Sequence, residues 1–152
     1  MELIRDFTGE QYEGALSSWM WIGLAGKTPL CTSPFGDVFL QAEDGLWWLD
    51  TIGGELTRVW DSVEELEAVL NTDDGMQKYL LAGLALAVSE QGLEPSADQV
   101  YDFVHPPVLG GALAVGNVQV VDFVTALGIL GQLHQQVRDI PAGTRIKVVG
   151  QG

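Results

Sequence analysis

The sequence DVFLQAEDGLWWLDTIGGELTRVW, residues 37–60, contains three short runs rich in aliphatic and aromatic residues. These runs, 37–40, 46–49 and 56–60, are separated by short segments that contain glycine and acidic residues. Runs of this length and composition are typical of β-strands, and glycine next to Asp or Glu is typical of the tight turns between them. Strands joined by such short turns pair with their neighbours in the antiparallel sense. The stretch therefore predicts a three-strand antiparallel meander.

Helical patterns flank this meander on both sides. Thr8 is suited to cap a first helix, and Ser62 followed by Glu65 forms a capping box at the start of another. The apolar spacing predicts helices over 8–19, 62–71, 75–91 and 125–138. Further strands are predicted over 100–104, 118–123 and 145–149.

The order of these elements determines the predicted class. Strands and helices are mixed without the regular βαβ alternation of a parallel sheet, and this pattern is typical of an α+β protein. A chain of 152 residues also suits one hydrophobic core. We predict a single domain with a mixed or antiparallel sheet, containing the three-strand meander, packed against about four helices. Residues 1–33 are expected to form an N-terminal helical segment packed on the α+β domain of residues 34–152.

The charge of the chain is unevenly distributed. There are 21 acidic and 7 basic residues, a formal net charge of −14. Residues 34–74 hold eleven acidic residues and a single base, Arg58, whereas the charges from residue 100 onward sum to zero. Direct binding to nucleic acid or to an anionic membrane needs clustered Lys and Arg, so both are disfavoured. The segregation favours a binding face for a basic protein or a cation over a surface that serves only solubility.

Aromatic residues accompany the acidic ones. Adjacent strand residues face opposite sides of a sheet, so Trp47 and Trp48 cannot both point into the core. A tryptophan surrounded by charge is typical of the anchor of a protein interface, although a neighbouring helix could also cover it. The predicted partner-binding residues are Asp37, Glu43, Asp44, Trp48, Asp50, Asp61, Glu64, Glu65 and Glu67.

The residues that could support catalysis are few. Cys31 is the only cysteine, and His105 and His134 are the only histidines. They fall in different predicted elements without a recognised Cys–His signature. We therefore interpret Cys31 as core packing, His105 as a structural hydrogen-bonding group, and His134 as a core or boundary imidazole. Neither metal-ligand spacing nor a phosphate-binding glycine loop is evident, so no cofactor, metal or enzyme activity is expected.

The expected location follows from similar arguments. One cysteine cannot form an intrachain disulfide, and the first residues lack the basic and apolar regions of a secretory signal. The longest apolar run, 79–88, is much shorter than the roughly 20 residues that span a bilayer. We expect a cytoplasmic protein.

Several motifs resemble a known bacterial domain. HPPVLGG at 105–111, NVQVVD at 117–122 and ILGQLHQQVRDIPAGT at 129–144 are similar to the C-terminal domain of immunity proteins against type VI secretion DNase effectors. PFGDVFL at 34–40 and LWWLDT at 46–51 resemble two strands of that domain. Ala112, which follows the double glycine, departs from a position that is often polar in the family.

The resemblance, over about residues 34–146, implies a fold and a function. The fold is a mixed α+β domain similar to SUKH-type immunity proteins, and many relatives carry an additional N-terminal domain. The implied function is a cytosolic antitoxin-like protein that binds a cognate nuclease and blocks it without catalysis, as a monomer or weak dimer. An acidic face could occupy the basic DNA-binding cleft of such a toxin. Two alternatives remain: a SUKH-like protein- or ligand-binding module of another function, and a Cys/His enzyme.

Overall fold

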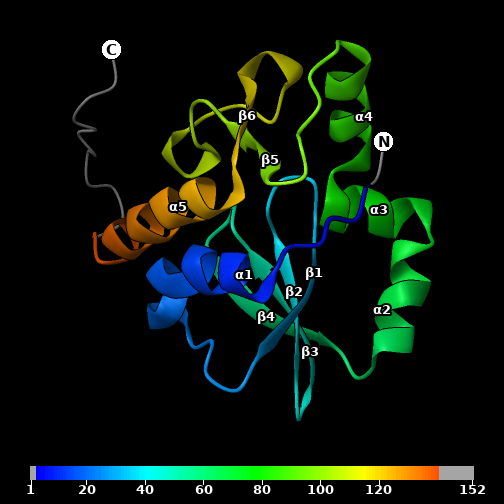
Figure 1. Ribbon diagram of the computed structural model, residues 1–152, viewed down its shortest axis with the longest axis vertical. Coiled ribbons are helices and arrows are strands. Elements are labelled where there is room, and N and C mark those ends of the chain that lie inside the picture. Colours follow the sequence, from blue (N-terminus) through cyan, green and yellow to red (C-terminus); the bar gives the residue numbers. More distant parts are fainter. Residues whose placement is uncertain (1–2, 141–152) are drawn as a thin grey trace.

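A four-stranded antiparallel sheet forms the centre of the molecule (Figure 1). The computed structural model describes residues 3–140. The strands are β1 (Thr28–Thr32), β2 (Val38–Ala42), β3 (Gly45–Asp50) and β4 (Glu55–Trp60), and they lie in sequence order across the sheet. The predicted meander is confirmed as β2, β3 and β4. The additional strand β1 was not predicted, because Pro29 interrupts its pattern; proline is tolerated there because β1 is an edge strand.

The hairpin between β2 and β3 is tight because of Gly45. Ala42 pairs with Gly45, so only Glu43 and Asp44 form the loop. Gly45 has φ +134°, and a Cβ atom at this position would lie 2.5 Å from the backbone oxygen of Trp60. Glycine therefore allows both the turn and the close approach of β4. Both acidic residues of the loop are consequently exposed at the hairpin tip.

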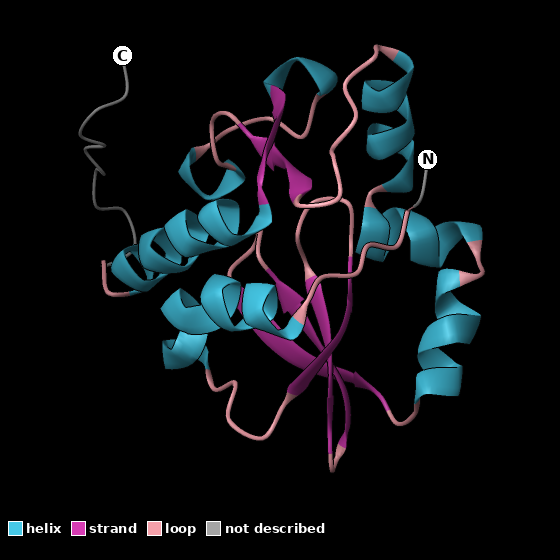
Figure 2. Cartoon of the chain, viewed as in Figure 1, coloured by secondary structure: helices cyan, strands magenta, loops and turns pink. Residues whose placement is uncertain are grey.

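Five α-helices, one more than the predicted four, occur within residues 3–140, and the longest of the 3₁₀ segments follows the first of them (Figure 2). They are α1 (Gly9–Leu16), η1 (Ser17–Ile22), α2 (Val63–Leu70), α3 (Asp73–Leu80), α4 (Ala82–Glu90) and α5 (Phe123–Arg138). The mixed helices and antiparallel strands confirm the α+β class. No helix in the described part of the chain is both long and apolar enough to cross a membrane.

The prediction of one helix over 75–91 is wrong. The chain forms α3 and α4 instead, and Leu81 between them has left-handed backbone angles, φ 49° and ψ 46°. The two helices bury their apolar residues in different places: Tyr79 packs with the α2 side of the sheet, whereas Val88 packs with a separate cluster. A straight helix could not reach both clusters, so tertiary packing overrides the continuous helical pattern.

A second, two-stranded sheet completes the fold. The strands β5 (Gln99–Phe103) and β6 (Val118–Asp122) pair antiparallel, as predicted, and the short 3₁₀ segments η2 (Pro107–Leu109) and η3 (Val115–Asn117) lie in the loop between them. The backbone N–H of Tyr101 donates to the Pro34 oxygen at 2.8 Å and links this hairpin to the segment before β2. The strand predicted over 145–149 lies outside the described residues.

Helices cover both faces of the four-stranded sheet (Figure 1). On one face, Val38 and Leu40 of β2 are buried in a cluster with residues from α1, η1 and α5. On the other face, Phe39 packs in a cluster formed with α2 and α3. This alternation follows from the two-residue period of a strand.

Candidate protein-binding surface

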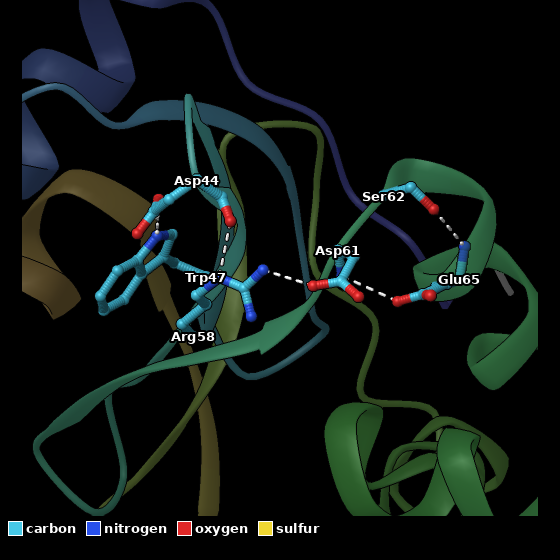
Figure 3. A network of polar contacts seen from close by, with 6 residues as sticks. All are labelled: Asp44, Trp47, Arg58, Asp61, Ser62 and Glu65. Atoms are coloured by element: carbon cyan, nitrogen blue, oxygen red, sulfur yellow. Dashed lines mark hydrogen bonds and ion pairs between the residues drawn. The ribbon is translucent and has the colours of Figure 1, made fainter.

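A network of polar contacts connects the β2–β3 hairpin tip to the start of α2 (Figure 3). The Arg58 side chain on β4 donates from Nε to the backbone oxygen of Asp44 at 2.6 Å. Its guanidinium also forms an ion pair with Asp61. The Asp61 backbone N–H in turn donates to the Glu65 carboxylate at 2.7 Å. Arg58 therefore holds acidic residues from two separate elements next to each other.

The capping box at α2 is only half formed. Ser62 accepts a hydrogen bond from the Glu65 backbone N–H at 3.2 Å, as predicted. The Glu65 side chain, however, accepts from Asp61 and not from the Ser62 backbone. The carboxylate is still close to the positive N-terminal end of the helix, so it stabilises α2. Glu65 consequently has a structural role in addition to its charge.

The six exposed acidic residues around this network form what we call the acidic edge. They are Glu43, Asp44, Asp61, Glu64, Glu65 and Glu67. Glu64 and Glu67 lie on α2 and are about 5 Å apart along the helix axis. Arg58 is the only basic residue in the network, so the edge has an excess of negative charge. Six of the nine predicted partner-binding residues are brought together here.

The other three predicted residues, Asp37, Trp48 and Asp50, lie elsewhere. Asp50 ends β3, roughly 17 Å along the strand from the hairpin tip. Trp48 is half-buried on the α3 side of the sheet, with its ring centroid 4.8 Å from that of Tyr79. Trp47 packs on the opposite face. The prediction that the two tryptophans face opposite sides is confirmed, but neither is fully exposed.

The prediction that Asp37 belongs to an exposed binding face is wrong, because only 3% of this residue is accessible to solvent. One carboxylate oxygen accepts from the Thr51 backbone N–H at 2.8 Å and from the Thr51 hydroxyl at 3.0 Å. The other accepts from the Ser33 hydroxyl at 3.0 Å. Burial, together with the charge of Asp50, raises the pKa of Asp37 from 3.8 to about 7. Asp37 therefore holds the segments before β2 and after β3 together rather than contacting a partner.

The cysteine and histidines occupy structural positions. Burial raises the pKa of the Cys31 thiol to about 11, so it is protonated at neutral pH. The His105 ring Nε2 contacts the Leu109 oxygen at 3.1 Å, and that of His134 contacts the Thr51 oxygen at 2.9 Å. Burial lowers the pKa of His134, which is consistent with a neutral core imidazole. The structural interpretation of both histidines is confirmed. Within residues 3–140 no three His, Cys, Asp or Glu residues are grouped as metal ligands.

The loop between β5 and β6 is fixed by Asn117. Its side-chain amide accepts from the His105 backbone N–H at 2.9 Å and donates to the His105 and Ala112 oxygens, both at 2.9 Å. Gly111 packs so closely that a Cβ atom there would lie 1.7 Å from the His105 oxygen. The glycines and the asparagine of this motif thus shape the loop.

Gly111→Ala is expected to destabilise the protein by about 1–3 kcal/mol, because the methyl group would force the loop backbone apart. Gly116→Ala in the same loop is the matched control, since a methyl group added there would meet open space and its φ is not positive. Urea unfolding of both variants measures the difference. Equal free energies of unfolding for the two variants would show that the close approach of Gly111 to the His105 oxygen does not require a glycine.

These features define a mixed α+β domain with a segregated acidic surface. Residues 61–134 match the family described as "T6SS immunity protein Tdi1, C-terminal". This match confirms the resemblance indicated by the motifs: over that range the chain is similar to the C-terminal domain of a type VI secretion immunity protein. The matched range includes α2 and the β5–β6 loop, and it ends within α5.

A solved structure has a similar fold. The crystal structure of Atu4351 from Agrobacterium tumefaciens superimposes with a TM-score of 0.56 at 18% sequence identity. The alignment covers 86% of this chain and 66% of that one, so this chain spans about two thirds of the length of its structural neighbour. At this identity the similarity supports the fold alone. No curated protein sequence matches the chain at a significant level.

Proposed function

We propose that this chain is an immunity protein that binds a cognate type VI secretion toxin and neutralises it without catalysis of its own. The family match over residues 61–134 supports the immunity role. The toxin is proposed to be a nuclease with a basic surface, and the complex to form in the cytoplasm with a monomer or weak dimer of this chain. Nucleic acid and membranes are not proposed as partners.

The acidic edge is the observation that carries this proposal. A nuclease that grips DNA needs a cleft lined with Lys and Arg. The acidic edge offers such a cleft several carboxylates that are fixed on a hairpin tip and a helix start. Charge complementarity of this kind steers association and raises its rate at low salt. Because Arg58 holds Asp44 and Asp61 in place, the edge is pre-organised before the partner arrives.

Charge reversal of the acidic edge is the direct test. The variant replaces Glu43, Glu64 and Glu67 with Lys and keeps Glu65, whose carboxylate accepts from the Asp61 backbone. We expect the affinity for the toxin to fall roughly 10- to 100-fold and its salt dependence to change, because attraction becomes repulsion. A nuclease toxin encoded next to this chain, once identified, is co-expressed with it as the partner. Affinity is then measured at several salt concentrations.

A second triple variant controls for net charge. Glu10, Glu13 and Glu90 are also exposed, and they lie on α1 and α4, which contribute no residue to the acidic edge. Their replacement with Lys changes the net charge by the same amount and is expected to affect the affinity much less. Unchanged affinity and salt dependence in the first variant, or equal losses in both, would contradict the proposed role of the acidic edge.

A further inference from the structure

A small cavity of about 160 Å³ lies at the end of β3 opposite the acidic edge. Its walls come from the sheet, from the junction of α3 with α4, and from the β5–β6 loop. The lining residues are Asp37, Trp48, Asp50, Ile52, Lys78, Leu81 and Leu113. The wall therefore combines carboxylates, an indole, an ammonium and apolar side chains, and its volume suits one side chain rather than a helix or a strand.

Within residues 3–140, the unpaired indole N–H of Trp48 is the first observation that indicates a ligand. Its Nε1–H is buried and has no hydrogen-bond partner among residues 3–140. The indole N–H groups of Trp19, Trp21 and Trp47 each donate to an oxygen within the protein. A buried donor without an acceptor is costly, so it favours any ligand that brings a carbonyl or carboxylate oxygen.

The charges of the lining residues indicate which kind of ligand. One oxygen of Asp50 accepts from the backbone N–H groups of Ile52 and Gly53, at 3.1 and 3.0 Å, whereas the other accepts no hydrogen bond within the described part of the chain. Asp37 is buried beside it, and the charge of Asp50 disfavours its ionisation. Lys78 is exposed and forms no ion pair with residues 3–140; its Nζ lies 5.3 Å from the Tyr79 ring centroid. Asp50 therefore offers a carboxylate oxygen that no hydrogen bond or ion pair within residues 3–140 occupies, and this acceptor favours a cationic donor over an anion.

We propose that this cavity binds one arginine side chain of the partner, with the guanidinium at Asp50 and a neighbouring backbone carbonyl accepting from Trp48 Nε1. The inference rests on the proposed binding of a basic toxin and adds a specificity site to it. Arginine fits better than lysine because its planar group offers several donors in a fixed arrangement and also stacks on aromatic rings such as Trp48. Leu113, which is 55% exposed at the rim, can cover the aliphatic part of that side chain.

A titration without toxin tests this site. The probe is N-acetyl-arginine-N-methylamide, which carries a guanidinium and backbone carbonyls, added to the ¹⁵N-labelled full chain. We expect the Trp48 indole N–H resonance, assigned with Trp48→Phe, to move downfield and saturate in the millimolar range. The resonances of Trp19 and Trp21 should stay in place, because their N–H groups already donate to Leu127 and Gly131.

Two comparisons determine whether the effect is specific. The citrulline analogue of the probe has the same shape without the charge. Asp50→Asn keeps an oxygen for the Ile52 and Gly53 N–H groups but removes the charge. Each is expected to weaken binding roughly tenfold, as for the loss of a charge-assisted hydrogen bond. No saturable shift of Trp48, equal binding of the citrulline probe, or unchanged binding by Asp50→Asn would overturn the assignment. Because the titration contains no toxin, its failure would leave the result of the charge-reversal test intact.

Discussion

Asp37→Ala is expected to destabilise the protein by about 3–5 kcal/mol, because the change leaves several buried donors without their acceptor. The Thr51 backbone N–H, the Thr51 hydroxyl and the Ser33 hydroxyl all donate to the Asp37 carboxylate. These bonds connect the turn before β2 with the end of β3. The loss is measured by urea unfolding at about pH 4, where the buried carboxyl is still protonated in the folded protein. A cost below about 1 kcal/mol would contradict this role.

Asp37→Asn separates the hydrogen bonds from the charge. Asparagine keeps an oxygen for both Thr51 donors, so its cost is expected to be much smaller than that of alanine. The carboxyl pKa is about 7 in the folded protein and 3.8 in the reference state, so the folded state binds the proton more tightly. The contribution of this carboxyl group to the free energy of unfolding is then fully present below about pH 4. It is lost as the pH rises through about 7, and the total loss is up to about 4 kcal/mol.

The measurement is the difference in unfolding free energy between wild type and Asp37→Asn across this pH range. Other carboxylates titrate in the same range, but they are common to both proteins and cancel in the difference. The difference should decline as the pH rises from about 4 to about 7, because only the wild type has a titrating group at this position. A difference that stays constant with pH would show that Asp37 is not held in its neutral form by burial.

The elements that could be predicted are those whose signals are local. The meander from β2 to β4 and the start of α2 at Ser62 follow from turn residues and a cap, which act over a few positions. The break at Leu81 could not be predicted, because the residue with left-handed backbone angles is a leucine, whereas glycine usually occupies such a position. It exists because Tyr79 and Val88 are buried in different clusters, and only the tertiary structure creates those clusters.

The candidate surface could likewise be predicted only in part, because the sequence does not show where the tertiary structure places each acidic residue. Sequence reasoning grouped Asp37 and Asp50 with the acidic residues of the hairpin tip, because all lie in one acidic stretch. Their separation depends on the length and register of β3, which places Asp50 at the far end of the strand. The burial of Asp37 also depends on Ser33 and Thr51, whose hydroxyls reach it from two different segments. The link from Asp44 to Asp61 through Arg58 is likewise a product of the pairing of β3 with β4.

Trp19→Ala is expected to destabilise the protein by about 3–5 kcal/mol, since truncation of a fully buried tryptophan leaves a large cavity. Trp19 lies in η1, and its indole N–H donates to the Leu127 oxygen of α5 at 2.9 Å. Its ring centroid is also 5.6 Å from that of His134. The variant therefore removes one buried contact between η1 and α5.

Met20→Ala is the matched control, because Met20 is the next residue in η1 and 59% of it is exposed. Its expected effect is within about 0.5 kcal/mol. Urea unfolding is followed both by tryptophan fluorescence and by far-UV circular dichroism. If residues 1–33 fold as one unit with the rest, the Trp19 variant will show a single transition, shifted equally in both signals. Two separate transitions would instead show that the N-terminal segment docks on an independently stable domain. In that case the buried contact of Trp19 with α5 does not join the segment and the domain into one cooperative unit.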